Sequence, residues 1–297
     1  MKDYTFSDGR PQVHSFFDTA TNTVSHIVVD PETKKCAVID SVMDFEPNAA
    51  KISFESADRL IELIKKEGYE VEWVMETHAH ADHLSAAPYI QQQLGGKVAI
   101  GEHISTVQEV FGKVFNFGTE FERDASQFDR LFKDGDTFKI GNIEARVIHT
   151  PGHTPADVTY VIGDSAFVGD TLFMPDYGTA RCDFPGGSAE TLYDSTQKIF
   201  ALPDETRLFM CHDYLPEGRT EYIWETTVAD QRGKNIHVGY DAETNKEKFV
   251  EMRNERDSKL GMPRLIIPSI QVNINKGKLP EAEENGTQYL KVPINKF

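Results

Sequence analysis

Residues 77–83 concentrate the side chains best suited to bind a transition metal. His78, His80, Asp82 and His83 all lie within this heptapeptide. Imidazole and carboxylate groups at this density are typical ligands of zinc and iron. The heptapeptide follows an apolar run that predicts a β-strand, so it lies in a loop beyond the carboxyl end of that strand, where α/β folds bind ligands. An exposed polar turn would explain one or two of these histidines, but not the distant residues that share their character.

Three further polar side chains follow apolar runs later in the chain. His153 lies just after a strand on a Pro-Gly turn, Asp170 follows a second run and His212 a third. Because strand ends converge at one rim of a layered sheet, we expect these residues to meet the heptapeptide. Singly, each is explained by a capping aspartate or a hydrogen-bonded turn histidine. Together with the heptapeptide they favour a metal site. His149 lies near His153 but outside the pattern, and His103 and His237 receive no role.

The elements that would position these residues follow from periodicity and turn residues. An antiparallel meander is predicted first, and then a helix that begins at Ser56 and ends near Glu67, with Gly68 as its stop. Hairpin turns are predicted at Gly141-Asn142 and Gly163-Asp164. The predicted strands are 13–18, 25–30, 35–40, 71–76, 97–100, 136–140, 143–149, 158–162 and 166–168, and helical stretches are predicted at 85–94, 107–111 and 243–256.

This order of elements predicts an α+β fold in which two sheets face each other with helices outside. The charged, partly helical tail after about residue 235 is interpreted as an extension of the same domain. We therefore expect one domain over residues 1–297, with a core of about 13–235 and an extension of about 236–297. The stretch around 107–111 would form either a lid or a dimer contact, and the sequence leaves that choice open.

Composition excludes several classes of partner. The 297 residues are 39% hydrophobic and carry a formal net charge of −17, which argues against nucleic acid and anionic membrane as partners. No apolar run of about 18 residues predicts a membrane span, and residues 1–9 contain no apolar segment typical of a secretory signal. A cytoplasmic location is therefore expected.

The three cysteines, Cys36, Cys182 and Cys211, do not form the pattern of a disulfide framework. Cys36 is expected in the core, and Cys182 is expected to be an unreactive loop thiol, although a neighbouring Arg181 would favour a thiolate. Strand alternation places Cys211 opposite His212, and so toward the core rather than toward a metal.

The order His78-x-His80-x-Asp82-His83, then His153, Asp170 and His212, resembles the metallo-β-lactamase superfamily over about residues 13–214. The resemblance implies an αββα sandwich of two facing mixed sheets, with the metal site at one edge. In its hydrolytic branch, one zinc would bind His78, His80 and His153, a second would bind Asp82, His83 and His212, and Asp170 would bridge them. That ligand set implies a dinuclear zinc hydrolase of a glutathione thioester, like glyoxalase II, or of a lactone.

The sequence around the ligands is more similar to the persulfide dioxygenases, in segments 76–83, 151–155, 169–173, 180–184 and 211–214. That resemblance implies one Fe(II) held by His78, His153 and Asp170, and oxidation of glutathione persulfide by O₂ to sulfite and glutathione. The tail is similar to that of bacterial members described as β-lactamase-like hydrolases. Members of the family are often homo-oligomers, so a homo-oligomer is expected.

The same resemblance assigns the remaining polar residues. His80, Asp82, His83 and His212 would surround the iron ligands without touching the ion. Arg181 and Tyr214 would line the substrate entrance, although an ion pair of Arg181 with Asp183 and a core position for Tyr214 are alternatives. A third hypothesis, a redox scaffold or sulfur-carrier partner with a purely structural metal, explains the ligands less well, because a structural zinc needs four closed ligands.

Overall fold

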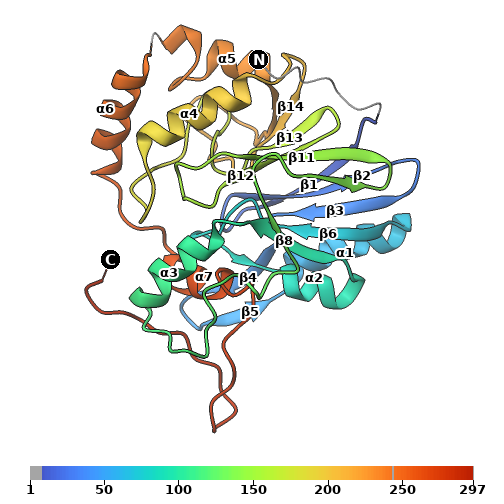
Figure 1. Cartoon of the computed structure of the whole chain (residues 1–297), viewed down its shortest axis with the longest axis vertical. Helices are drawn as coiled ribbons and strands as arrows, with labels where there is room; N and C mark the ends of the chain where they lie inside the picture. Colours follow the sequence, from blue (N-terminus) through green and yellow to red (C-terminus); the bar gives the residue numbers. More distant parts are fainter. Residues whose placement is uncertain (1–8, 243, 297) are drawn as a thin grey trace.

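Two six-stranded sheets lie face to face between two layers of helices in this computed structural model, which describes residues 9–242 and 244–296 (Figure 1). The first sheet has the strand order β1-β2-β3-β6-β8-β9 and the second β10-β11-β12-β13-β14-β15. The first comprises β1 (Gln12–Asp18), β2 (Thr23–Val29), β3 (Lys35–Ile39), β6 (Glu70–Met75), β8 (Lys97–Gly101) and β9 (Arg130–Phe132). The second comprises β10 (Thr137–Ile140), β11 (Ile143–His149), β12 (Val158–Ile162), β13 (Ser165–Phe167), β14 (Arg207–Phe209) and β15 (Glu225–Thr227).

The side chains of the first sheet alternate between two hydrophobic cores, one on each face of the sheet. In β3, Cys36 and Val38 belong to the core under the helices, whereas Ala37 and Ile39 belong to the core between the sheets. Successive side chains of a strand point to opposite faces, so a strand that is covered on both sides must be apolar throughout. The predicted αββα layering is thereby confirmed.

Helices cover the outer face of each sheet (Figure 1). The first layer contains α1 (Glu55–Glu67), α2 (Ala87–Leu94), α3 (Ile104–Val114) and α7 (Ile266–Asn273), beside a small sheet of β5 (Lys51–Ser53), β4 (Val42–Glu46) and β7 (Leu84–Ser85). The second contains α4 (Ala189–Phe200), α5 (Val228–Lys234) and α6 (Lys246–Asp257), with the 3₁₀ turn η1 (Tyr240–Ala242) between α5 and α6. No helix of the described residues is long and apolar enough to cross a membrane.

Most predicted elements are confirmed. The meander β1-β2-β3 and the hairpins β10-β11 and β12-β13 are antiparallel as expected. Gly68 ends α1 with a φ of +70°, but the predicted cap is wrong. Phe54 occupies the N-cap position without a side-chain bond, and Ser56 lies in the first turn, where its N–H and Oγ donate to Asp44. Residues 1–9, where no secretory signal was predicted, lie outside the described residues except for Gly9.

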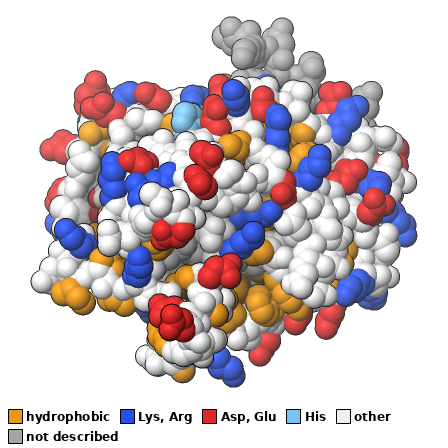
Figure 2. All heavy atoms as spheres, turned by 60° about the horizontal axis from the view of Figure 1, so that its bottom comes forward, with side chains coloured by type: hydrophobic (Ala, Val, Ile, Leu, Met, Phe, Trp, Pro, Cys, Tyr) orange, Lys and Arg blue, Asp and Glu red, His pale blue; other side chains and the backbone are white. Residues whose placement is uncertain are grey.

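The segment after residue 235 crosses from one helical layer to the other. In Figure 1 it runs from α6, which packs on α4 through the buried Phe249, to α7, which packs beside β7. Ile266, Ile270 and Val272 of α7 are buried in the core under the first sheet. Charges of both signs are mixed on the face seen in Figure 2, and hydrophobic side chains are exposed among them. The segment therefore contacts both halves of the sandwich.

Candidate metal centre

Strand ends position all seven predicted ligands at one edge of the sandwich. The heptapeptide follows β6, His153 lies in the loop between β11 and β12, Asp170 follows β13 and His212 follows β14. The loop that holds His153 is pressed against α4, because a Cβ on Gly152 would lie 2.4 Å from the Leu192 Cα. Gly152 has a φ of +145°, so both its backbone and its surroundings require glycine here.

His78, His153 and Asp170 form one cluster of three buried ligands. The Nε2 of His153 lies 3.6 Å and the Nε2 of His78 lies 3.9 Å from the same Oδ2 of Asp170. In each of these two histidines, the Nδ1 atom has a hydrogen-bond partner on the side of the ring away from Asp170. His153 Nδ1 lies 2.8 Å from the carbonyl oxygen of Arg181, and His78 Nδ1 lies 3.1 Å from Thr77 Oγ1.

These partners assign the tautomers. A carbonyl oxygen only accepts, so His153 Nδ1 carries the proton. Thr77 Oγ1 donates its own proton to Asp40, so it accepts from His78 Nδ1. In both rings the lone pair is therefore on Nε2, which faces Asp170. This arrangement, in which a second group orients each imidazole, is the usual support for a metal-bound histidine.

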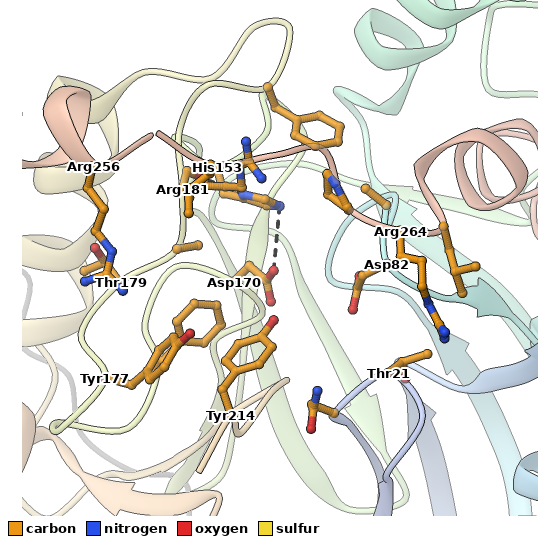
Figure 3. A pocket seen from close by; sticks show the side chains of 18 of the residues that line it. Thr21, Asp82, His153, Asp170, Tyr177, Thr179, Arg181, Tyr214, Arg256 and Arg264 are labelled. Atoms are coloured by element: carbon orange, nitrogen blue, oxygen red, sulfur yellow. Dashed lines mark hydrogen bonds and ion pairs between the residues drawn. The ribbon is translucent and has the colours of Figure 1, made fainter. Parts of the chain in front are cut away.

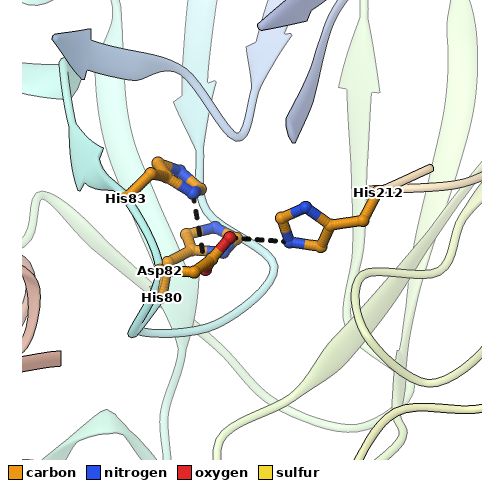
Figure 4. Close-up of side chains that lie close together, drawn as sticks. All are labelled: His80, Asp82, His83 and His212. Atoms are coloured by element: carbon orange, nitrogen blue, oxygen red, sulfur yellow. Dashed lines mark ion pairs between the residues drawn. The ribbon is translucent and has the colours of Figure 1, made fainter. Parts of the chain in front are cut away.

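A second cluster is formed by His80, Asp82, His83 and His212 (Figure 4). His212 Nε2 lies 3.3 Å from Asp82 Oδ2 and 3.4 Å from Asp170 Oδ1. Asp170 thus turns one carboxylate oxygen to each cluster. His212 Nδ1 lies 3.2 Å from the carbonyl oxygen of Asn22, which again leaves the lone pair on Nε2. The structure brings all seven residues together as two adjoining ligand sets.

The fit of these residues to a metal rests on their unpaired atoms. Buried polar atoms in proteins almost always have a hydrogen-bond partner. Six polar atoms in the two clusters are buried and have none, which is the arrangement expected of groups that donate lone pairs to a cation. They are His78 Nε2, His80 Nδ1, Asp82 Oδ2, His83 Nε2, Asp170 Oδ1 and His212 Nε2.

The electrostatics of the two clusters differ. Burial, with the positive charge of neighbouring histidines, lowers the pKa of His78 well below its usual value. Burial also opposes a charge on His80, but Asp40 and Glu76 outweigh it and hold the pKa of His80 well above its usual value. His80 Nε2 lies 3.0 Å from Asp40 Oδ1 and 3.3 Å from Glu76 Oε2. Burial raises the pKa of Asp157, whose Oδ1 lies 3.7 Å from His78 Nδ1, to about 7.

A cavity of about 320 Å³ opens onto the clusters (Figure 3). Its size falls within the range of small-molecule sites. Tyr214 lines it, and in Figure 3 its ring points toward Asp170. Its ring stacks on those of Tyr177 and His212, with centroids 4.9 Å and 5.6 Å away. Burial raises the pKa of Tyr214 well above its usual value, so its hydroxyl remains a donor.

Arg181 lines the cavity, but its donors are used. Its Nε and Nη2 each donate to Asp183 at 2.6 Å, and its Nη1 donates to the carbonyl oxygen of Gly261 at 2.7 Å. The alternative of an ion pair with Asp183 is thus the geometry observed. The backbone carbonyl of Arg181, rather than its guanidinium, contacts the ligand cluster, through His153.

All three cysteines are buried, and the structure corrects one prediction about them. Cys182 is buried, and burial raises its pKa, so it does not meet the condition for a reactive thiol. Cys211 was expected in the core, away from the metal ligands. It is buried as expected, but its Sγ lies within 4.8 Å of ligand atoms of Asp170 and His212. The expected orientation is wrong because β14 ends at Phe209, so strand alternation no longer applies at Cys211.

Several residues of the site carried no sequence signal. Asn273, at the end of α7, donates through Nδ2 to the carbonyl oxygens of His80 and His83, both at 2.8 Å, and accepts from the N–H of Ser85 at 2.8 Å. A single asparagine thus binds the backbone of the heptapeptide and of Ser85, two residues after it. Only the tertiary fold reveals this contact, since 188 residues separate Asn273 from Ser85. Further residues that line the cavity are Phe173, Tyr177, Phe184, Arg253, Arg256 and Arg264.

Comparison with known proteins identifies the superfamily. Residues 19–212 match the family model of the metallo-beta-lactamase superfamily. The chain is 51% identical over 293 residues to a probable metallo-hydrolase of Burkholderia pseudomallei, covering 95% of this chain and 99% of that protein. It is 49% identical over 285 residues to a beta-lactamase hydrolase-like protein of Xylella fastidiosa, covering 96% of this chain but 65% of that protein.

Two more distant likenesses concern a different chemistry. The chain is 30% identical over 268 residues to the mitochondrial persulfide dioxygenase ETHE1 of Homo sapiens, covering 89% of this chain and 88% of that protein. The crystal structure of ETHE1 from Myxococcus xanthus superposes with a TM-score of 0.71 at 27% identity, covering 90% of this chain and all of that one. The match to the family model ends at His212, so the segment that carries α6 and α7 lies outside it.

Proposed function

The chain belongs to the metallo-beta-lactamase superfamily, and from this premise we propose that it is a persulfide dioxygenase that uses one Fe(II) per chain. The overall reaction converts one glutathione persulfide, one O₂ and one water into one glutathione and one sulfurous acid, which ionises to sulfite. The observation that supports this proposal most directly is the cluster of His78, His153 and Asp170 at the edge of the cavity. Two imidazoles and one carboxylate are the ligand set of non-haem Fe(II) oxygenases.

Iron held by His78 Nε2, His153 Nε2 and Asp170 would supply open positions for the persulfide sulfur and O₂ and the redox chemistry between them. The protein's own groups keep the ligands in place. Thr77 Oγ1 and the carbonyl of Arg181 fix the two rings, and Phe173 and Phe184 give the cavity apolar walls that limit water. The protonated Tyr214 would donate to the substrate beside Asp170.

In this proposal the second cluster does not hold an ion. His80, Asp82, His83 and His212 would orient water molecules and the free oxygen of Asp170. Arg181 acts through its backbone, because its guanidinium is bound to Asp183 and Gly261. The 30% identity to the human persulfide dioxygenase over 268 residues supports this chemistry.

A dinuclear zinc hydrolase of a glutathione thioester or a lactone is the second candidate. Its support is the set of unpaired atoms in the second cluster, together with the second oxygen of Asp170. The names of the relatives at 51% and 49% identity, a metallo-hydrolase and a beta-lactamase hydrolase-like protein, also favour it. In that case the two ions would hold a hydroxide for attack on a carbonyl carbon.

Metal content and oxygen consumption distinguish the two candidates. Protein purified without O₂ is expected to contain about one iron per chain, and glutathione persulfide is expected to cause O₂ uptake with one sulfite formed per O₂. Two zincs per chain, no O₂ uptake and thioester cleavage in the absence of O₂ would establish the hydrolase instead.

A pair of histidine variants tests the ligand assignment. His153→Ala should lose both iron and O₂ uptake. His103→Ala is the matched control, because His103 is exposed and contacts only the ring of His149 among the ring pairs described. Equal iron content in the two variants would contradict the assignment of His153.

A further inference from the structure

The outer wall of the cavity is cationic although the chain is acidic. The formal net charge is −17, yet four arginines line this one cavity: Arg181, Arg253, Arg256 and Arg264. Among the described lining residues the carboxylates are Asp82 and Asp170, and both belong to the metal clusters. An excess of guanidinium groups in a cavity attracts anionic ligands. The substrate should therefore carry negative charge away from its reacting atom.

Two of the four arginines are already neutralised. Arg181 is bound on both edges by Asp183 and the Gly261 carbonyl. Arg253 is almost fully buried and donates to Asp257 and, at 3.1 Å, to the carbonyl oxygen of Thr179. A guanidinium that is held in this way has few donors left for a ligand. Neither residue is free to recognise a carboxylate.

Arg256 and Arg264 have no carboxylate in contact. Neither forms an ion pair with any residue in the described part of the chain, and both are exposed. Arg264 acts on Glu46 only at longer range, where it adds to the backbone hydrogen bonds that lower the pKa of that carboxyl. Arg256 Nη1 lies 3.4 Å from His237 Nε2, but His237 Nδ1 accepts from the N–H of Thr179, so Nε2 carries the ring proton. That nitrogen cannot accept, and the Arg256 guanidinium retains donors without an acceptor.

The two free guanidiniums lie on opposite sides of the metal cluster. In Figure 3, Arg256 and Arg264 flank His153 and Asp170 from the left and the right. Arg256 lies in the last turn of α6, and Arg264 lies just ahead of α7, so both come from the segment after residue 235. A ligand that satisfies both needs two carboxylates with its reactive group between them.

We propose that Arg256 and Arg264 bind the two terminal carboxylates of a tripeptide thiol or persulfide and so place its central sulfur at His153 and Asp170. Glutathione has this layout, because its thiol is on the middle residue and each end bears a carboxylate. A chain of three residues spans up to about 10 Å when extended, and Arg256 and Arg264 line the same cavity. The proposal rests on the proposed function for its substrate, but it concerns binding and not the oxidation.

Binding of thiols to the metal-loaded protein without O₂ tests this assignment independently of turnover. The probes are glutathione, glutathione monoethyl ester, in which the glycine carboxylate is blocked, and cysteinylglycine, which lacks the glutamyl carboxylate. Titration calorimetry should show that Arg256→Ala and Arg264→Ala each weaken glutathione binding by roughly 10- to 100-fold, the loss expected for a charge-assisted hydrogen bond. Arg59→Ala is the matched control, because Arg59 is exposed on α1 and also forms no ion pair with the described residues.

The ester and cysteinylglycine, which each lack one free carboxylate of glutathione, give the sharper result. If each arginine binds one carboxylate, one variant should bind the ester as tightly as wild type does, and the other should bind cysteinylglycine as tightly as wild type does. In O₂-uptake assays each variant should raise the KM for glutathione persulfide with kcat nearly unchanged. Equal losses for all three probes, or losses no larger than in Arg59→Ala, would overturn the proposal. A protein that consumes no O₂ but shows this binding pattern would refute the dioxygenase function and leave the two-carboxylate site intact.

Discussion

Replacement of Asp257 by alanine should destabilise the protein strongly, because it would leave a buried arginine without its counter-charge. Arg253 is 2% exposed and Asp257 is 4% exposed, so water cannot take over the role of the carboxylate. Removal of one partner of such a buried pair costs about 3–5 kcal/mol. At roughly 2–3 °C per kcal/mol, the midpoint of thermal unfolding should fall by roughly 6–15 °C. Asp257 also accepts from the N–H of Cys182 at 2.7 Å, so the cavity wall should loosen too.

The same helix provides a matched control. Glu255 and Lys259 form an ion pair with the same spacing of four residues, but their side chains are 69% and 68% exposed. Glu255→Ala should therefore leave the unfolding midpoint unchanged. The double variant Arg253→Met, Asp257→Leu should recover most of the loss, since it removes both charges together. A drop in Asp257→Ala no larger than that in Glu255→Ala, or a double variant as unstable as the single one, would refute the reasoning.

Three further predictions concern other parts of the molecule. Burial lowers the pKa of His26 to about 4, so its contribution is present above pH 6.5 and is lost as the pH falls toward 4. His26 should account for roughly 3 kcal/mol of the change in the free energy of urea unfolding over that range. His26→Gln should flatten the profile by that amount, whereas an equal slope in the variant would exclude His26. Gly152→Ala should lower both thermal stability and metal content, because its Cβ would meet the backbone of Leu192, and normal metal content would show that the loop can shift. Asn273→Asp should weaken metal binding in chelator competition by removing both bonds to the heptapeptide carbonyls. Asn275→Asp should not, because the half-buried Asn275 donates to the carbonyl oxygen of Lys278 instead, and equal affinities would contradict this role.

The sequence predicted those parts of the site that depend on local pattern. Each ligand follows an apolar strand, and strand ends meet at one edge of a layered fold whatever the details of the loops. The same local logic failed at Cys211, because the strand ends two residues before it. It failed at Ser56 as well, since Asp44 on a neighbouring strand competes for its hydroxyl.

The outer wall of the cavity could not be predicted from local pattern. Arg256 and Arg264 read as ordinary surface charges in a charged tail, and only the crossing from α6 to α7 brings them to the cavity. The predicted helix at residues 243–256 corresponds to α6, but α7 gave no amphipathic signal because it is buried on most sides. Asn273 is the clearest case, since its three bonds join it to a loop about 190 residues earlier.

The crossing of the C-terminal segment also sets an order of events during synthesis. All seven candidate ligands precede residue 213, whereas Asp257, Gly261 and Asn273, which hold the loops that carry them, emerge later. At about 5–20 residues per second, the ribosome completes the last ligand roughly 3–12 s before it reaches Asn273. During that interval the heptapeptide carbonyls lack the asparagine that fixes them. We therefore expect ordered capture of a metal to follow the release of α7 from the ribosome, so that a nascent chain stalled before α7 exchanges its metal freely.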